Sequence, residues 1–310
     1  MLEKVDLTKK ISKEEYKAKM PQMEIELGRL QRECRELKIP VMIVFEGFGA
    51  SGKGVQIGKL IQSMDPRGFQ VFPIKAETED ERMHPFLWRF WTKTPEAGRI
   101  AIFDGSWYRK VLIDRFEKRT REKEIETAFH SIEAFEKQLT DGGTILVKLL
   151  LDIDQKEQKK RFEKLLEKKE TAWRVSQGDR ERNAKYSEYA AMMEEVLYRS
   201  DTKSAPWTVI EATDRRFATV KIYMTVIHAL AEAVEAVQRR RMEEQAIKVA
   251  EQVSGQQEAA EIMRQAGGEL EMLQSSVLSR ADLTLAYGKE EYEKRLKKLQ
   301  KKIEKLHGEV

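Results

Sequence analysis

The feature that most constrains the fold of this chain is a glycine-rich loop between a short apolar run and a helix-compatible segment. Val41–Phe45 is a run of five apolar residues rich in β-branched side chains, which is typical of a strand buried on both faces of a parallel sheet. The loop follows as Gly47-Phe-Gly-Ala-Ser-Gly-Lys53, and Val55–Met64 then suits a helix. This order aims a helix N-terminus and several backbone N–H groups at an anion. The sequence therefore predicts an α/β fold with a phosphate-binding loop at the end of one strand.

The loop pattern also predicts which residues bind phosphate. Backbone N–H groups would wrap the phosphate oxygens, and the lysine would reach the outer phosphates. The residues expected to do so are Gly47, Gly49, Ala50, Ser51, Gly52, Lys53 and Gly54. Gly54 stands where most such loops place a Ser or Thr hydroxyl that holds Mg²⁺. We therefore expect the metal to be held by another residue.

Asp104 is the candidate for that metal ligand. It follows the short apolar run Ile100–Phe103, and a strand that ends in an acid is the second metal-side motif of enzymes with this loop. Asp104 and Lys53 are accordingly the predicted catalytic residues. The alternative interpretation is that Asp104 caps the helix that opens at Ser106 and Trp107.

The remaining apolar pattern predicts a layered fold. Residues 13–38 have helical periodicity, which Pro40 ends, and further short apolar runs occupy 69–74, 100–103, 144–151 and 207–210. Strands that alternate with helices in this way indicate a parallel sheet covered by helices. Phe217–Arg241 is predicted to be one long helix with an apolar stripe formed by Ile222, Val226, Leu230, Val234 and Val237. We expect the stripes between residues 217 and 306 to be exposed, which favours a homo-oligomer.

Charge and composition exclude several classes of protein. The chain of 310 residues has 57 Lys and Arg against 53 Asp and Glu, a net charge of +4 that is too small to argue for nucleic-acid binding. No apolar run approaches the ~18 residues of a membrane span, and the first residues lack the apolar core of a secretory signal. The expected location is therefore the cytoplasm. Cys34 is the single cysteine, which excludes an intrachain disulfide and leaves a free thiol on a helix.

A local cluster of basic residues follows the run at 144–151. Lys156–Arg174 contains eight Lys or Arg residues against four Glu residues. Such a cluster can close over a polyanion as a helical lid. The alternative is a solvated helix face.

An internal repeat predicts the domain organisation. Asp6-Leu7-Thr8 and Lys13-Glu14-Glu15-Tyr16 recur as Asp282-Leu283-Thr284 and Lys289-Glu290-Glu291-Tyr292 at a constant spacing of 276 residues. We therefore expect a phosphate-loop domain at 1–238 with a helical lead-in at 1–39, a helical linker at 239–275, and the truncated start of a second copy at 276–310.

With these residues in hand, the chain resembles the polyphosphate kinase 2 family, most closely the N-terminal half of its two-domain polyphosphate:AMP phosphotransferases. The similarity runs in the family's order from residue 5 to about residue 235. The segments that carry it are Val44-Phe-Glu-Gly-Phe-Gly-Ala-Ser-Gly-Lys-Gly54, His84-Pro-Phe-Leu-Trp-Arg89, Phe103-Asp-Gly-Ser-Trp-Tyr108, Lys160-Arg-Phe162, Trp173-Arg-Val-Ser176 with Asp179, and Ser204-Ala-Pro-Trp207.

This resemblance implies a three-layer, P-loop kinase-like fold with a parallel sheet, a helical lid and a long helical C-terminal extension. It also implies Mg²⁺ and transfer of a phosphoryl group between inorganic polyphosphate and a nucleotide, with AMP converted to ADP. Lys53 would touch the transferring phosphates and Asp104 the metal. The residues expected along the polyphosphate path or in the lid are Lys75, Arg109, Lys110, Lys160, Arg161 and Arg174.

Two positions depart from the family pattern. Gly49 stands where the family's loop carries an aspartate, and Gly105 replaces the arginine of Phe-Asp-Arg-Ser-Trp-Tyr. Loss of one acid and one guanidinium would each cost on the order of 10²–10³ in rate. Two alternatives therefore stay open beside the phosphotransferase: a non-catalytic partner domain that supports an active second domain, and an ATP-dependent nucleoside monophosphate kinase.

Overall fold

The structure is a computed structural model that describes residues 2–265, 288 and 291–299. It divides into two compact units, Met1–Ala246 and Ile247–Val310. The strands are β1 Val41–Gly47, β2 Phe69–Pro73, β3 Ile100–Asp104, β4 Ile145–Asp152 and β5 Trp207–Glu211. The longer helices are α1 Lys13–Leu37, α2 Lys53–Gln62, α6 Glu122–Asp141, α7 Gln155–Leu166, α9 Gln177–Ala184, α10 Tyr186–Ser200 and α11 Arg215–Gln265. The short helical turns are η1 Leu2–Lys4, η2 Pro66–Gly68, α3 Glu79–Arg82, α4 Trp88–Trp91, η3 Trp107–Lys110, α5 Ile113–Phe116 and α8 Lys169–Ala172.

The five strands form one parallel sheet in the order β2-β3-β1-β4-β5. β1 pairs with β3 through Phe45 and Asp104, and with β4 through Gly47 and Leu151. Every residue of β1 is buried, because helices cover both faces of the sheet. The strand order reverses at β1, so the crevice beyond its carboxyl end is where this class of fold places its ligands.

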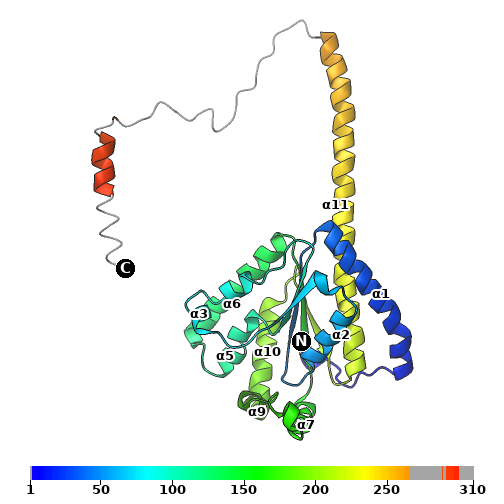
Figure 1. The fold of residues 1–310 in the computed structure, drawn as a ribbon, viewed down its shortest axis with the longest axis vertical. Coiled ribbons are helices and arrows are strands. Elements are labelled where there is room, and N and C mark those ends of the chain that lie inside the picture. The colour runs from blue at the N-terminus through cyan, green and yellow to red at the C-terminus, as the bar shows by residue number, and fades with distance from the viewer. Residues whose placement is uncertain (1, 266–287, 289–290, 300–310) are drawn as a thin grey trace. The chain divides into compact units, whose positions relative to one another are not determined.

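Helices form a layer on each face of the sheet, as Figure 1 shows. In one layer, Thr219 of α11 bonds Gln56 of α2, and Tyr223 of α11 bonds Ser63 just after α2. In the other layer, Lys148 of β4 contacts α6 and the end of α10. The predicted three-layer α/β fold is confirmed.

The lead-in helix α1 forms for reasons that the sequence shows. Ser12 and Glu15 make a capping box at its start, and Lys38 ends it in the left-handed conformation. Its apolar stripe is buried at Met20, Leu27 and Leu30. Cys34 lies on the same face as a free, buried cysteine, and burial raises the pKa of its thiol to about 11.

The structure moves the predicted bounds of one strand and two helices. The expectation that the apolar stripe of α11 is exposed is wrong. β1 extends two residues beyond Phe45, and α2 begins at Lys53 rather than at Val55. α11 begins at Arg215 and continues to Gln265, well past the predicted end at Arg241. The stripe of α11 from Ile222 to Val234 is buried in the core, so it offers no exposed face for self-association. It forms the inner side of the α11 layer instead.

Residues 215–247 of α11 are long and apolar enough to satisfy a length-and-composition test for a membrane span. Half of the most apolar window is buried inside the domain, which is the pattern of a core helix.

The predicted restart of the repeat at Asp282-Leu283-Thr284 lies outside the described residues, and so do residues 266–275 of the predicted linker, whose residues 239–265 are part of α11. Residues 291–299 are helical. The three-part division of the chain stays a prediction.

Candidate functional site

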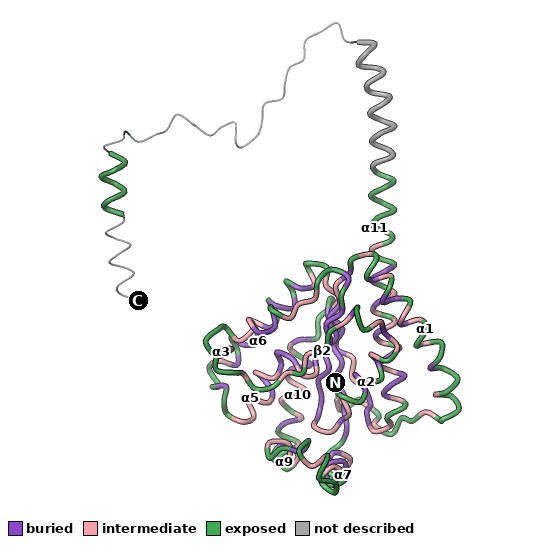
Figure 2. The backbone as a smooth tube through the Cα atoms, viewed as in Figure 1, coloured by how far each residue is buried: buried purple, intermediate pink, exposed green. Residues whose placement is uncertain are grey.

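The candidate site lies at the carboxyl ends of the strands. β1 ends in the glycine-rich loop, and its neighbour β3 ends in Asp104. α7 and α9 lie at this end of the domain in Figure 1, and Figure 2 shows that both helices carry many exposed residues, whereas β1, β3 and β4 are almost entirely buried. The site therefore combines a rigid buried base with helices that face solvent.

The loop turns sharply against β4 at its first glycine. Gly47 has φ of +138°, and a Cβ on it would lie 2.2 Å from the carbonyl oxygen of Leu151, so only glycine fits there. At the far end, Gly52 precedes α2 and provides no side-chain cap. The first amides of α2 are therefore left for a ligand. Lys53 Nζ donates to the carbonyl of Gly47 over 3.0 Å.

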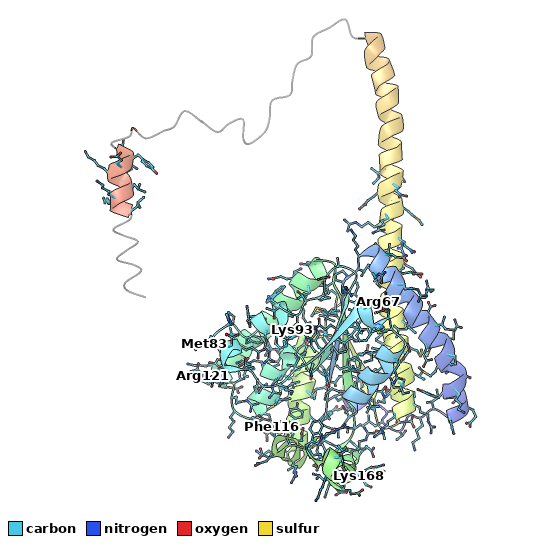
Figure 3. The ribbon with its side chains drawn as sticks, in the orientation of Figure 1. Arg67, Met83, Lys93, Phe116, Arg121 and Lys168 are labelled. Atoms are coloured by element: carbon cyan, nitrogen blue, oxygen red, sulfur yellow. The ribbon has the colours of Figure 1, made fainter. Side chains whose placement is uncertain are left out.

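A cavity of about 860 Å³ opens beside the loop. Its wall contains three predicted parts of the site: loop residues 50–54, Asp104, and basic residues of the predicted lid. The lid side chains that line it are Arg161, Lys164, Leu165, Lys168, Thr171, Trp173 and Arg174. Lys168, labelled in Figure 3, lies at the same end of the domain as α7. The geometry thus brings a phosphate loop, an acid and several cations to one space.

Arg161 holds the loop in place. Its Nη1 donates to the carbonyls of Ala50 and Ser51 over 3.1 and 3.0 Å, and its Nη2 donates to those of Ala212 and Thr213 over 2.8 and 2.9 Å. Its Nε donates to Glu157 over 2.7 Å. Five donors are all a guanidinium has. The sequence predicted Arg161 as a lid residue that contacts polyphosphate, whereas the structure gives it a bracing position.

A second cavity, of about 410 Å³, adjoins the first. The residues that line it are Glu157, Lys160, Arg161, Lys164, Thr213, Asp214, Arg215 and Arg216. Arg161, Lys164 and Arg215 line both cavities. Lys160, a predicted polyphosphate residue, lines this cavity and not the larger one.

Asp104 is placed to serve a metal. A Cβ on Gly54 would lie 3.9 Å from Asp104 Oδ2, so the carboxylate faces the position that usually carries a metal-binding hydroxyl. The alternative that Asp104 caps a helix is not what the structure shows, because Ser106 caps η3. Within the described residues no three His, Cys, Asp or Glu side chains gather as a metal site. A metal here would need phosphate oxygens and water as its other ligands, which is how Mg²⁺ is usually bound.

Glu46 is a site residue that the sequence reasoning missed. It is buried at the end of β1, and its Oε1 accepts a hydrogen bond from Ser106 Oγ over 2.7 Å. Burial raises the pKa of Glu46, while Lys53 opposes that shift and Asp104 adds to it. The sequence signal that could have identified Glu46 is the acidic residue in the segment Val44-Phe-Glu-Gly, at the end of an apolar run.

The Trp107-Tyr108 pair anchors the segment that follows Asp104. Trp107 Nε1 donates to Glu136 Oε1 over 2.9 Å, and the Tyr108 hydroxyl donates to the same oxygen. Lys148 Nζ donates to Glu136 Oε2 over 2.8 Å and to the carbonyl of Ser200 over 2.6 Å. The buried ion pair of Lys148 and Glu136 thus brings opposite charges together, and hydrogen bonds satisfy the polar groups of both side chains. The aromatic residues therefore fix the end of β3, and with it Asp104.

The two departures from the family pattern have a structural setting. A Cβ on Gly49 would lie 2.9 Å from Asp179 Oδ1 and 3.2 Å from Phe162 Cζ. Asp179 is held there by Ser176 and by Arg182 Nη2 over 2.8 Å. Burial alone would raise the pKa of Asp179, but these hydrogen bonds outweigh it and lower the pKa. Gly105 has φ of +74°, a conformation that side chains rarely adopt.

Three predicted residues do not line either cavity. Lys75 is exposed after β2. Arg109 Nε lies 3.3 Å from Asp114 Oδ1, and Lys110 Nζ lies 5.9 Å from the centre of the Phe86 ring. Their assignment to the polyphosphate path stays a prediction.

Comparison with known proteins agrees with this geometry. Residues 10–241 match the family described as Polyphosphate kinase 2 (PPK2). The chain belongs to the polyphosphate kinase 2 family. It is 36% identical over 233 residues to a polyphosphate:AMP phosphotransferase of Pseudomonas syringae pv. tomato, covering 75% of this chain and 47% of that protein. It is 31% identical over 216 residues to an NDP-polyphosphate phosphotransferase of Ruegeria pomeroyi, covering 70% of this chain and 72% of that protein.

The solved structure of a putative polyphosphate kinase 2 from Pseudomonas aeruginosa PA01 superimposes on this chain with a TM-score of 0.73 and 35% identity. The matched region covers 76% of this chain and 50% of the other. The chain thus spans about half the length of these polyphosphate:AMP phosphotransferases. The resemblance seen in the sequence and the P-loop kinase-like fold are both confirmed at the level of the family.

Proposed function

We propose that this domain binds inorganic polyphosphate at its loop and takes part in phosphoryl transfer between polyphosphate and a nucleotide, with AMP to ADP as the direction expected. The observation that carries the proposal is one cavity that joins the uncapped α2 N-terminus, Asp104, the basic residues Arg161 and Lys164 of α7, and Lys168 and Arg174 on either side of α8. Relatives named for AMP, NDP and ADP all pair the nucleotide with polyphosphate. We place the protein in the cytoplasm, without a nucleic-acid or membrane partner.

The chain's own residues would supply positioning and charge neutralisation, which is most of what phosphoryl transfer requires. The loop amides hold phosphate oxygens. Lys53 exchanges its bond to the Gly47 carbonyl for a phosphate oxygen. Lys164, Lys168 and Arg174 close the open side of the cavity and exclude water from it.

Mg²⁺ fits the residues that are present. Asp104 would hold it, with phosphate oxygens and water as the other ligands, and bound Mg²⁺ would neutralise the charge that develops on the transferred group. The room beside Asp104 left by Gly54 is consistent with a hydrated ion.

A second candidate is a phosphate-binding partner domain without turnover of its own. The setting of Gly49 favours it, because a Cβ there would lie 2.9 Å from Asp179 Oδ1, so that a loop aspartate would compete with Asp179 for the same space. Binding would then serve a separate active domain.

The test measures ADP formation from AMP and Mg²⁺ with either polyphosphate or ATP as donor, using this chain. In parallel, calorimetry with tripolyphosphate compares the chain with its Lys53→Ala variant. ADP formed from polyphosphate but not from ATP supports transfer. Tripolyphosphate binding that Lys53→Ala weakens, without turnover, supports the partner domain. Turnover with ATP alone would identify a nucleoside monophosphate kinase, and the absence of any phosphate binding would refute all three.

A further inference from the structure

A charged carboxylate lies beside the phosphate loop, although the loop has the features of an anion-binding site. Asp179 Oδ1 lies 2.9 Å from the place that a Cβ on Gly49 would take. Burial raises the pKa of Asp179, but hydrogen bonds from Ser176 and Arg182 together outweigh burial and hold the pKa below its ordinary value. The group is therefore ionised at neutral pH, and it repels a phosphate in the loop unless another group cancels its charge.

Arg182 is the cation that cancels this charge. Its Nη2 donates to Asp179 Oδ1 over 2.8 Å, and its Nη1 donates to Glu117 Oε1 over 2.6 Å. The Arg182 side chain is 10% exposed, so salt and water screen these contacts only weakly. Gly178 leaves the room for them, because a Cβ there would lie 2.8 Å from Glu117 Oε1. The guanidinium is therefore held between two acids from different parts of the chain.

The ion pairs continue beyond Glu117 to the segment that follows β3. Glu117 also pairs with Arg119, whose Nη2 donates to Asp114 Oδ1 over 2.7 Å. Arg109 Nε, in η3, lies 3.3 Å from the same oxygen. Three acids and three arginines thus alternate from α9 to η3. This ion-pair chain connects α9, beside the loop after β1, to the segment after β3.

α9 is also tied to the loop by two amide side chains. Gln158 Nε2 donates to the carbonyl of Gly49 over 3.0 Å, and Gln158 Oε1 accepts a hydrogen bond from Asn183 Nδ2 over 2.8 Å. Gln158 is buried. Asn183 lies four residues after Asp179, on the same face of α9. These contacts keep α9 close to the loop, so the charge beside Gly49 depends on the pairing of Asp179 with Arg182.

We propose that Arg182 is a positioning residue of the phosphate-binding site, which holds Asp179 in place and cancels the negative charge that would otherwise repel phosphate from the loop. By resemblance, the family carries its acid in the loop at position 49, whereas here a carboxylate from α9 lies beside that position with its own counter-ion. The inference rests on the proposed function of the loop. It adds that two residues outside the loop set the electrostatic potential at the loop.

The experiment measures tripolyphosphate affinity by calorimetry with the full chain, at low and at high salt. Arg182→Ala leaves the Asp179 carboxylate without its cation, so binding should weaken about tenfold at low salt. Asp179→Asn keeps the size of the side chain and removes its charge, so binding should tighten about tenfold. Both effects should shrink to less than about threefold in ~1 M salt, because dissolved ions screen the charges.

A double variant separates a charge effect from a structural one. Asp179→Ala combined with Arg182→Ala removes the acid together with its cation, so tripolyphosphate affinity should return to within about twofold of the unmodified chain. If Arg182 has only a structural role, the losses of the two single variants add instead. Arg180→Ala removes an exposed arginine from the same helix and is the matched control, which should change binding by less than about twofold.

Asp179→Asn keeps the test decisive if Arg182→Ala does not fold, because the amide keeps the shape of the side chain and one acceptor oxygen. Weaker or unchanged binding in Asp179→Asn would overturn the proposal, and so would a loss in Arg182→Ala that salt does not reduce. If the unmodified chain does not bind tripolyphosphate, the proposed function of the loop fails, and the positioning role fails with it. That result differs from tripolyphosphate binding that neither variant changes, which overturns the positioning role alone.

Discussion

Replacement of Arg161 by alanine tests whether the phosphate loop depends on a buried brace. The change removes five hydrogen bonds: two to the loop, two to the turn after β5 and one to Glu157. It leaves four backbone carbonyls without that donor and Glu157 without its nearest cation. Each net hydrogen bond contributes roughly 1 kcal/mol, and breaking a buried charge pair typically costs about 3–5 kcal/mol. We therefore expect the free energy of unfolding to fall by about 3–5 kcal/mol.

The assay is urea unfolding followed by circular dichroism, with tripolyphosphate calorimetry on the folded fraction. Because the loop carbonyls would turn away from their present direction, the amides that face the cavity would lose their alignment. Phosphate affinity should therefore fall at least about tenfold, even where the variant is fully folded.

Two further variants make this measurement selective. Arg161→Lys keeps the charge but cannot reach four carbonyls at once, so it should recover only part of the stability. Arg180→Ala removes an exposed arginine from α9 and should cost less than about 0.5 kcal/mol. If Arg161→Ala loses less than about 1 kcal/mol and binds tripolyphosphate normally, Arg161 is a lid residue after all and the bracing role is refuted.

Three other changes probe the same region. Gly49→Asp should destabilise the fold by about 2 kcal/mol because of the contact with Asp179, and urea unfolding should show a smaller loss when Asp179→Ala accompanies it; additive losses would contradict the contact. A serine at position 54 has room for its side chain beside Asp104, so Gly54→Ser should tighten Mg²⁺-dependent tripolyphosphate binding about three- to tenfold. The control Gly58→Ser, on the same helix, should leave this binding unchanged. If Gly54→Ser does not tighten binding, the result argues against a metal at Asp104. Burial, with Asp154 and Glu211 nearby, raises the pKa of Asp152 to about 6. The folded state therefore binds a proton more tightly than the unfolded chain, so this group's contribution to stability falls as pH rises from about 4 to 6. Asp152→Asn should flatten that slope and stabilise the protein at pH 7 by about 2–3 kcal/mol; an unchanged slope would show that Asp152 does not titrate there.

The sequence predicted the parts of the fold that local chemistry determines. β1, its loop and α2 follow from an apolar run, the spacing of three glycines and a lysine, and helical periodicity, and all three elements form where expected to within two residues. The end of α11 was missed because residues 242–265 have few large apolar side chains, yet no proline interrupts them and a single glycine, Gly255, does not end the helix.

The candidate site was predictable only where a side chain acts through its own motif. Lys53, Asp104 and Arg174 line the cavity as their positions imply. Arg161 could not be distinguished from its basic neighbours, because its role depends on carbonyls that come from about 50 and 110 residues away in the chain. The sequence of a run of lysines and arginines does not show which of these side chains is buried in the folded protein.

Glu46 also shows a limit of prediction from sequence, although here the sequence does mark the residue as unusual. A lone acid inside an apolar strand contradicts the pattern of a buried strand, and such local conflicts are expected at functional or strained positions. The conflict is visible in the sequence, but its resolution depends on Ser106, which follows β3, and on Lys53 from α2. Only the sheet order brings those two residues to the end of β1.

Phosphate binding and phosphoryl transfer make different demands, and this chain meets them unequally. Binding needs backbone amides, an uncapped helix and cations, and the described cavity contains all of them. By resemblance, transfer also uses an acid at position 49 and an arginine at position 105. A Cβ at position 49 would lie 2.9 Å from Asp179 Oδ1, so an aspartate there requires the Asp179 side chain to move, and the φ of +74° at Gly105 strains any side chain placed there. Phosphate binding can therefore be measured apart from turnover, because loop residues 50–54 and the basic side chains line the cavity without any side chain at positions 49 and 105.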